Sequence, residues 1–293
     1  MKKIDRMSVF MPDSCKAIIF VVHGMQEHRL RYDRLGDYLA SQGICTLAYD
    51  LPGHGVSLPE EERGYFGDDG WRALVDSAVF TAEWARRKHG GIPLFFFGHS
   101  MGTMIGRCFL QENASLVDGM ILSGAPCYQP AAFAGKAIAA LVKKTKGKRS
   151  HSKLLDQLAT GSFNKGIKSP RSPLDWLSYN EENVDAYIAD EACGFPFTAQ
   201  GYEDLFDGMI EMNDLKRFKD PDKHFPIYLF AGEDDPCIGG AKGWHATQDT
   251  LRQAGYENIS ARLYPGMRHE TLNEKGCEAV MQDICDWIDK QVA

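Results

Sequence analysis

The feature that most constrains the fold is an apolar run at residues 94–97, followed at once by the pentapeptide Gly-His-Ser-Met-Gly at residues 98–102. A Gly-x-Ser-x-Gly sequence at the end of a buried strand is the pattern of a nucleophile elbow. The chain must turn from strand to helix within these residues, which places the serine at the apex in a strained backbone conformation. Flanking glycines let the strand and the helix approach without side-chain clash. The pattern therefore predicts a strand, a tight turn and a helix, with the Ser100 hydroxyl projecting out of the sheet.

Strand-like apolar runs alternate with helical patterns along most of the chain. Helical spacing of apolar residues appears around Leu35–Leu39, Leu74–Ala85 and Val280–Ile288. The alternation predicts an α/β fold, with a mostly parallel central sheet covered by helices on both faces. The expected strands are 17–22, 44–49, 94–97, 120–122, 225–230 and 260–264, with an antiparallel strand at 8–11.

Residues 127–222 break this alternation, because they contain no clear buried strand. We predict a core of residues 1–126 and 223–293, with 127–222 inserted as a helical cap over the carboxyl edge of the sheet, where ligands bind in open α/β folds. Most of the large apolar residues in this segment are expected to form its own core, and the rest to line a pocket for an apolar substrate. The basic run at 143–149 is expected to be a solvated, flexible loop, with contact to an anionic lipid surface as the alternative.

Composition excludes several classes of protein. The net charge of −7 argues against nucleic acid as a partner. Residues 1–6 lack the apolar segment of a signal peptide, and no apolar stretch is long enough to span a bilayer. The eight cysteines show no paired spacing, which is typical of buried, reduced thiols. We therefore expect a cytoplasmic protein.

A serine nucleophile needs a base and an orienting carboxylate, which follow it in the order serine, acid, histidine in this kind of fold. The loop after the strand at 225–230 offers Glu233, Asp234 and Asp235. We favour Asp235, because Pro236 restricts its backbone to extended conformations and so fixes its carboxylate. Asp234 remains the alternative.

His269 is the predicted base, because it lies between the last expected strand and the last expected helix. His245 is the only other histidine after the acidic loop, but its neighbours indicate a helix. His269 and Glu270 also begin a zinc-protease string, which residue 273 leaves incomplete because it is asparagine. No metal is therefore predicted.

Two backbone N–H groups are candidates for an oxyanion hole. The N–H of Met101 would lie at the start of the helix after the elbow, where negative charge is favoured. The second donor is expected in the loop after an early strand, where Gly24 precedes Met25.

Four motifs carry a resemblance to a known family. They are His-Gly-Met-Gln-Glu-His at 23–28 with Arg-Tyr at 31–32, Asp-Leu-Pro-Gly-His-Gly-Val-Ser at 50–57, the elbow at 98–102, and His-Glu at 269–270 with Asn-Glu at 273–274. With them the chain resembles α/β-hydrolases of the monoacylglycerol lipase and lysophospholipase-like group, which is also called serine aminopeptidase-like. Gln26 departs from the small residue that many members carry.

The resemblance implies an α/β-hydrolase fold and cleavage of a carboxylic ester through an acyl-enzyme. Ser100 would be the nucleophile, His269 the base and Asp235 its partner, with Met25 and Met101 as oxyanion donors and with no metal or organic cofactor. A monoacylglycerol or similar lipid ester is the first expected substrate, reached by transient contact with a membrane surface. The alternatives are a lysophospholipase or broad carboxylesterase, then an aminopeptidase, and last a non-catalytic binding protein. The oligomeric state is not predicted.

Overall fold

The computed structural model describes residues 7–293 and contains a seven-stranded sheet with the order β1-β3-β2-β4-β5-β6-β7. β1 runs antiparallel to β3, and the remaining neighbours are parallel. β4 lies in the middle of the sheet, which places the turn after it at the centre of the carboxyl edge. The strands are β1 (Met7–Phe10), β2 (Ala17–Val22), β3 (Ile44–Tyr49), β4 (Leu94–His99), β5 (Gly119–Ser123), β6 (Ile227–Gly232) and β7 (Ile259–Tyr264).

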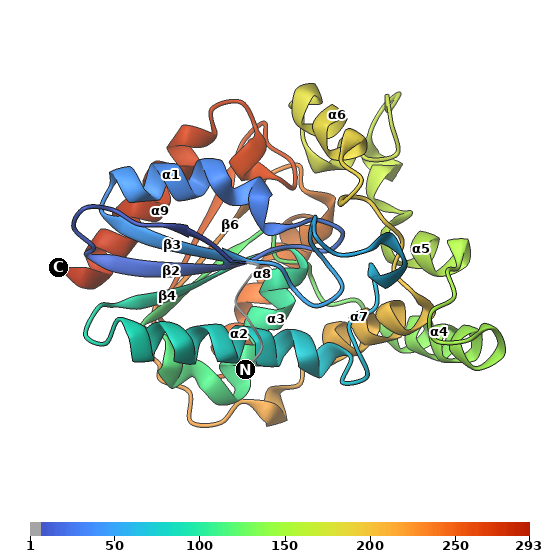
Figure 1. The fold of residues 1–293 in the computed structure, drawn as a ribbon, viewed down its shortest axis with the longest axis horizontal. Helices are drawn as coiled ribbons and strands as arrows, with labels where there is room; N and C mark the ends of the chain where they lie inside the picture. The colour runs from blue at the N-terminus through green and yellow to red at the C-terminus, as the bar shows by residue number, and fades with distance from the viewer. Residues whose placement is uncertain (1–6) are drawn as a thin grey trace.

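Helices cover both faces of the sheet (Figure 1). α1 (Asp33–Ser41) and α9 (Cys277–Val292) pack on one face, while α2 (Trp71–Lys88), α3 (Met101–Asn113) and α8 (Gly240–Gln253) pack on the other. Because side chains alternate along a strand, β2 supplies Ile18 and Phe20 to one core and Ile19 and Val21 to the other. The predicted α/β class, with its mostly parallel sheet between two helical layers, is confirmed.

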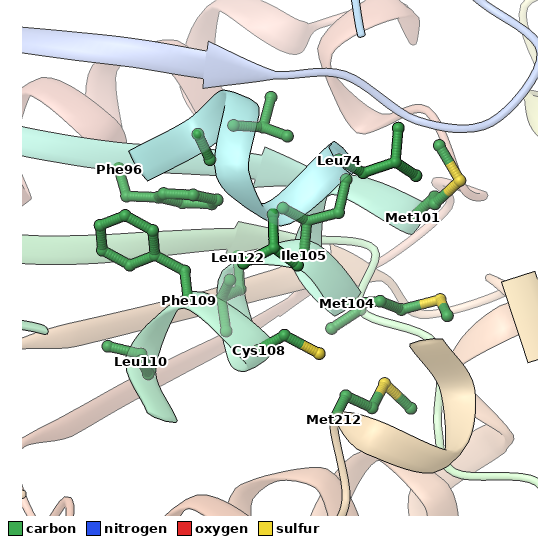
Figure 2. Packing of buried hydrophobic residues seen from close by; sticks show 14 of the residues in the cluster. Leu74, Phe96, Met101, Met104, Ile105, Cys108, Phe109, Leu110, Leu122 and Met212 are labelled. Atoms are coloured by element: carbon green, nitrogen blue, oxygen red, sulfur yellow. The ribbon is translucent and has the colours of Figure 1, made fainter. Parts of the chain in front are cut away.

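The elbow helix α3 is held tightly against the sheet. Figure 2 shows its apolar face, including Ile105 and Phe109, packed with Phe96 of β4 and Leu122 of β5. A Cβ added at Gly102 would lie 2.0 Å from the carbonyl oxygen of Val22 and would force the strand and helix apart. This glycine therefore performs the close-approach role that the pattern predicts.

Some predicted boundaries shift. β6 begins at Ile227 rather than at residue 225, because Pro226 has no N–H to donate to the ladder and contributes only its carbonyl, to Met120 N. The predicted loop at 143–149 is wrong for its first half. Residues 143–146 form the last turn of α4 (Ala132–Lys146), and the chain leaves the helix at Gly147, whose φ is 94°.

Between β5 and β6 the chain is helical, and the only bridge in that part of the described chain pairs His151 with Thr198. α4, α5 (Lys153–Thr160), α6 (Glu181–Ala189) and α7 (Ala199–Glu211) group at one end of the molecule (Figure 1). Residues 1–6, which the predicted core includes, lie outside the described residues.

Short 3-10 helices occupy Arg29–Tyr32, Glu60–Glu62, Ala114–Leu116, Phe163–Gly166, Asp175–Leu177, Leu215–Arg217, Pro236–Ile238 and Thr271–Asn273.

Most of the large apolar residues of 127–222 are buried or half-buried, as expected. Phe133, Leu141 and Leu154 are exceptions, at 58%, 61% and 54% exposed. α4 and α5 thus present apolar side chains to solvent. None of the helices within residues 7–293 has both the length and the apolar character needed to cross a bilayer.

Candidate active site

Ser100 lies at the junction of β4 and α3 with a backbone that L-residues rarely adopt. Its φ and ψ are 51° and −117°. Hydrogen bonds hold the turn, because Ser100 N donates to Ser123 O at 2.9 Å and Thr103 N donates to Ser100 O at 2.8 Å. Strain of this kind persists only where the surrounding structure enforces it, and it clusters at functional sites.

Asp235 and His269 are in direct contact, as predicted for an acid and a base in the loops after β6 and β7. The His269 Nδ1 atom lies 2.9 Å from Asp235 Oδ2, and both side chains are buried. Asp235 Oδ1 accepts a hydrogen bond from Cys237 N at 2.8 Å, which fixes the carboxylate. Asp234, the alternative acid, turns away and accepts a hydrogen bond from the hydroxyl of Tyr179 at 3.0 Å.

Ser100 and His269 line the same small cavity, together with Gly24 and Trp176. The His269 ring packs against the Trp176 ring, with centroids 5.0 Å apart. Among residues 7–293, no hydrogen bond joins the Ser100 hydroxyl to the imidazole. Catalytic hydrogen bonds are often long in unliganded enzymes and tighten only when substrate is bound.

The two predicted oxyanion donors flank Ser100. Met101 N is the first amide of α3, and Met25 follows Gly24 in the loop after β2. Within the described chain neither amide donates a hydrogen bond, so both are available to a ligand. Gln26, the departure noted in the motif, has a φ of 57°, and its carbonyl accepts hydrogen bonds from Tyr187 Oη at 2.7 Å and from Gly194 N at 2.9 Å.

A buried ionic network behind these loops was not predicted. Arg31 binds both carboxylate oxygens of Glu270 at 2.6 Å and one oxygen of Glu27 at 3.0 Å. Asn183 of α6 donates to Glu270 at 2.6 Å, and Glu27 accepts from Gly24 N at 2.5 Å. The network therefore connects the oxyanion loop, the histidine loop and α6. Its signal was present, because Glu27, Arg31 and Glu270 all belong to motifs on which the resemblance rests.

The charges around the site set its protonation states. Burial alone would raise the pKa values of Glu27 and Glu270, but Arg31 between them lowers the pKa of both carboxyls. Burial and the neighbouring His269 lower the pKa of His99 to about 4, so this imidazole is neutral at pH 7. Burial alone would lower the pKa of His269, but the charge and hydrogen bond of Asp235 raise it overall.

This raised pKa predicts the acid limb of the pH profile. A general base must be neutral to accept a proton. We therefore expect kcat/KM to fall as the pH drops through a value above about 6.5, the ordinary imidazole pKa. Steady-state measurements of kcat/KM on a neutral ester between pH 5 and pH 9 locate this acid limb. A limb well below pH 6 would contradict the assignment of His269 as the base.

Two clusters of metal-ligand side chains occur in the described chain. One is Asp235, Cys237 and His269, and the other is His28, Asp190 and Cys193. Burial raises the pKa of both thiols, Cys193 and Cys237, which keeps them protonated. A metal binds the thiolate form, so at either cluster it would have to displace the proton of a thiol whose burial favours the protonated form.

A larger cavity of about 450 Å³ opens next to Ser100. Cavities that bind small molecules commonly measure about 300–1,000 Å³. Its wall is mostly apolar and comes largely from the inserted helices, with Met25 and Met101 at the end near the serine. Apolar lining residues include Met104, Ile138, Leu158, Trp176, Phe206 and Met209.

A strained serine between a central parallel strand and its helix, with a buried acid–histidine pair in the loops after the last two strands, is the arrangement of an α/β-hydrolase. The chain belongs to the serine aminopeptidase family S33, whose model matches residues 13–276.

Relatives agree with this membership. The chain is 25% identical over 282 residues to a monoglyceride lipase of Mus musculus, which covers 95% of this chain and 84% of the relative. It is also 25% identical over 285 residues to a monoacylglycerol lipase of Mycolicibacterium smegmatis, which covers 96% and 91%. A crystal structure of a thermostable carboxyl esterase from Bacillus coagulans superposes with a TM-score of 0.90, at 24% identity over 98% of this chain and 94% of the esterase, and shows likeness of fold.

Proposed function

We infer that this chain is a carboxylic ester hydrolase, and we propose Ser100, His269 and Asp235 as its catalytic triad. The observation that carries the proposal is the buried Asp235–His269 pair, whose histidine lines the same cavity as the strained serine. An acid that holds an imidazole next to a serine can activate the hydroxyl as a nucleophile.

The proposed reaction has two halves, acylation of Ser100 and hydrolysis of the acyl-enzyme, and both use the same groups. The Ser100 oxygen attacks the ester carbonyl while His269 takes its proton, and Asp235 stabilises the imidazolium. The N–H groups of Met25 and Met101 bind the oxyanion, and each such donor typically stabilises the transition state by about 3 kcal/mol. His269 then gives the proton to the leaving alcohol. Water, deprotonated by the same histidine, hydrolyses the acyl-enzyme.

We propose a lipid ester with a single acyl chain, such as a monoacylglycerol, as the substrate. Support comes from the size and apolar wall of the cavity next to Ser100 and from the names of the relatives. Residues 127–222 are proposed to act as a cap, since most of the residues in that wall belong to this segment. A lysophospholipase or a broad carboxylesterase would use the same chemistry.

A parallel substrate screen tests this proposal. Monoacylglycerols, lysophosphatidylcholine, short p-nitrophenyl esters and aminoacyl amides are compared by kcat/KM. We expect the highest value for a monoacylglycerol, and a preference for amides would overturn the ester assignment. Rapid labelling by a fluorophosphonate separates an enzyme from a non-catalytic binding protein, because only an activated serine reacts quickly.

An aminopeptidase would need acidic groups to bind a substrate ammonium. α6 carries three acidic residues that could serve, Glu181, Glu182 and Asp185. Glu181 and Asp185 pair instead with Arg171 on the surface, and none of the three lines the cavities next to Ser100. These three residues therefore give no support to an aminopeptidase.

We also propose transient contact with a membrane surface through α4 and α5. α4 carries exposed Phe133 and Leu141 and, in its last turn, Lys144 and Lys146, while α5 carries exposed Leu154. Apolar and cationic groups of this kind together favour contact with an anionic lipid surface. Sedimentation of the protein with liposomes, with and without anionic lipid, measures this membrane contact. We expect stronger binding with anionic lipid, and loss of binding when Phe133 and Leu141 become serine. Equal, weak binding to all vesicles would refute the contact.

We propose a cytoplasmic location because the cysteines of the described chain are free thiols. Eight cysteines in the described chain are free, and all but Cys15 are buried. Free thiols without disulfides are typical of a reducing compartment.

Tyr187 is expected to position the oxyanion loop from the cap side. Its hydroxyl donates to the carbonyl of Gln26, next to the proposed donor Met25. Tyr187→Phe removes this bond but keeps the ring, which packs under Arg31. We expect kcat on a p-nitrophenyl ester to fall about tenfold while KM changes little, because the loss acts on the transition state. An unchanged kcat would show that the Gly194 amide alone holds the carbonyl.

A further inference from the structure

A second cavity of about 400 Å³ lies against the catalytic cavity, between α3, α8 and the chain that follows β5. The two cavities share Cys127 and Gln129 in their walls. Arg107 and Lys242 line the second cavity, and no aspartate or glutamate of residues 7–293 does. In a chain of net charge −7, a cavity with two cations and no carboxylate is a distinct electrostatic environment.

Arg107 is the central feature of this cavity. It lies in the middle of α3, is 2% exposed, and forms no ion pair with a carboxylate among residues 7–293. Its only partners there are two carbonyls, Thr103 O at 3.3 Å from Nε and Pro126 O at 2.8 Å from Nη2. Arg31, by contrast, is buried between two glutamates.

The charge on Arg107 is retained in spite of its burial. Burial lowers the pKa of Arg107 to about 10, so the guanidinium stays protonated at neutral pH. A buried charge without a counter-ion is unfavourable, and the guanidinium N–H groups that do not bond to the two carbonyls still require acceptors. An anion in the cavity would supply both the counter-ion and the hydrogen-bond acceptors.

Other groups in the cavity also lack partners. The Thr247 hydroxyl is buried and forms no hydrogen bond within the described chain. Gly239, Lys242 and Gly243 line the cavity at the first turn of α8, a helix of 14 residues whose N-terminus carries partial positive charge. Lys242 is exposed, which places its ammonium within reach of solvent.

From these contacts we propose that the second cavity binds a phosphate-type oxyanion, held by Arg107, Lys242 and Thr247. The planar guanidinium binds two phosphate oxygens at once, and the hydroxyl and ammonium donate to the others. The cavity exceeds the size of a phosphate, so an organic group can remain attached to it. This site is additional to the ester hydrolysis proposed above and does not depend on it.

Binding of inorganic phosphate tests the proposal without any turnover. We expect phosphate, compared with chloride at matched ionic strength, to raise the melting temperature of the wild type in a saturable way. Arg107→Met should abolish the rise. Lys290→Met removes one charge from the exposed end of α9 and should keep it in full. Equal shifts with chloride, or a full shift in Arg107→Met, would overturn the site.

Two milder variants protect the test against misfolding of Arg107→Met. Lys242→Met changes an exposed side chain, and Thr247→Val keeps the shape of a buried one. We expect each to raise the phosphate Kd measured by calorimetry, by about tenfold for Lys242→Met, which corresponds to about 1.4 kcal/mol. If both variants bind phosphate as the wild type does, the proposed ligands are wrong.

The phosphate can belong to a lipid headgroup or to a free metabolite, and substrate kinetics distinguish the two sources. A 1-acylglycerol 3-phosphate is compared with the 1-acylglycerol of the same chain length. A lower KM for the phosphorylated lipid, lost in Lys242→Met, supports a headgroup subsite next to the catalytic cavity. Equal KM values together with phosphate binding support a site for a free phosphate compound, with glycerol 3-phosphate as the calorimetric probe.

Discussion

Replacement of Ser100 by alanine is expected to reduce ester hydrolysis by about a millionfold, the loss typical of removing an activated serine nucleophile. The fold should survive, because the turn is held by backbone hydrogen bonds of Ser100 and by the glycines around it rather than by the serine hydroxyl. Initial rates on a p-nitrophenyl ester, with circular dichroism to verify folding, measure the effect. Labelling by a fluorophosphonate should disappear in parallel.

Ser169→Ala is the matched control. Ser169 also has a positive φ, of 50°, but it lies on the exposed surface and lines neither cavity next to Ser100. The same substitution in the same kind of backbone should leave the rate unchanged. A folded Ser100→Ala protein that keeps more than about 1% of the wild-type rate would refute Ser100 as the nucleophile. Loss of a triad serine leaves far less activity than that.

Asp235→Asn is expected to lower kcat by about 10⁴-fold. The amide keeps the volume of the carboxylate, but it removes the charge that stabilises the imidazolium of His269 and favours the wrong tautomer. The acid limb of the pH profile should also move to lower pH, because Asp235 raises the pKa of His269 in the wild type.

Asp234→Asn separates the two neighbouring acids. Asp234 bonds to Tyr179 on the surface and does not contact the imidazole, so its amide variant should keep the wild-type rate and pH limb within about twofold. A larger loss in Asp234→Asn than in Asp235→Asn would show that the loop rearranges when substrate binds. The assignment of the acid would then be wrong.

Much of the fold follows from local patterns. Every predicted strand in the described chain is present. β2 to β6 are apolar runs buried at every residue, as expected for strands in a sheet covered by helices, whereas the edge strands β1 and β7 are partly exposed. The shift of β6 and the helical last turn of α4 are boundary effects, where Pro226 and Gly147 decide where pairing or a helix ends. The preference for Asp235 over Asp234 also followed from a local signal, the backbone restriction by Pro236.

Other features depend on segments far apart in the chain. Arg31 and Glu270 both belong to the motifs of the resemblance, but no local pattern indicates that the two side chains meet, or that Asn183 joins them from α6. The exposure of Phe133 and Leu141 could not be predicted either, because their helical spacing fits a buried face as well as an exposed one. Which face is covered is decided by neighbouring elements.

The amino-acid sequence by itself determined the strand and helix order, the sharp turn at Ser100 and the loops that carry Asp235 and His269. These depend on backbone sterics and on the period of apolar residues, which act over a few neighbouring positions. Only the tertiary structure decided that Arg107 is buried with no carboxylate partner in the described part of the chain, while Arg31 has two. The pairing of a buried charge depends on which distant side chains packing brings within a few ångströms, and no local pattern encodes that.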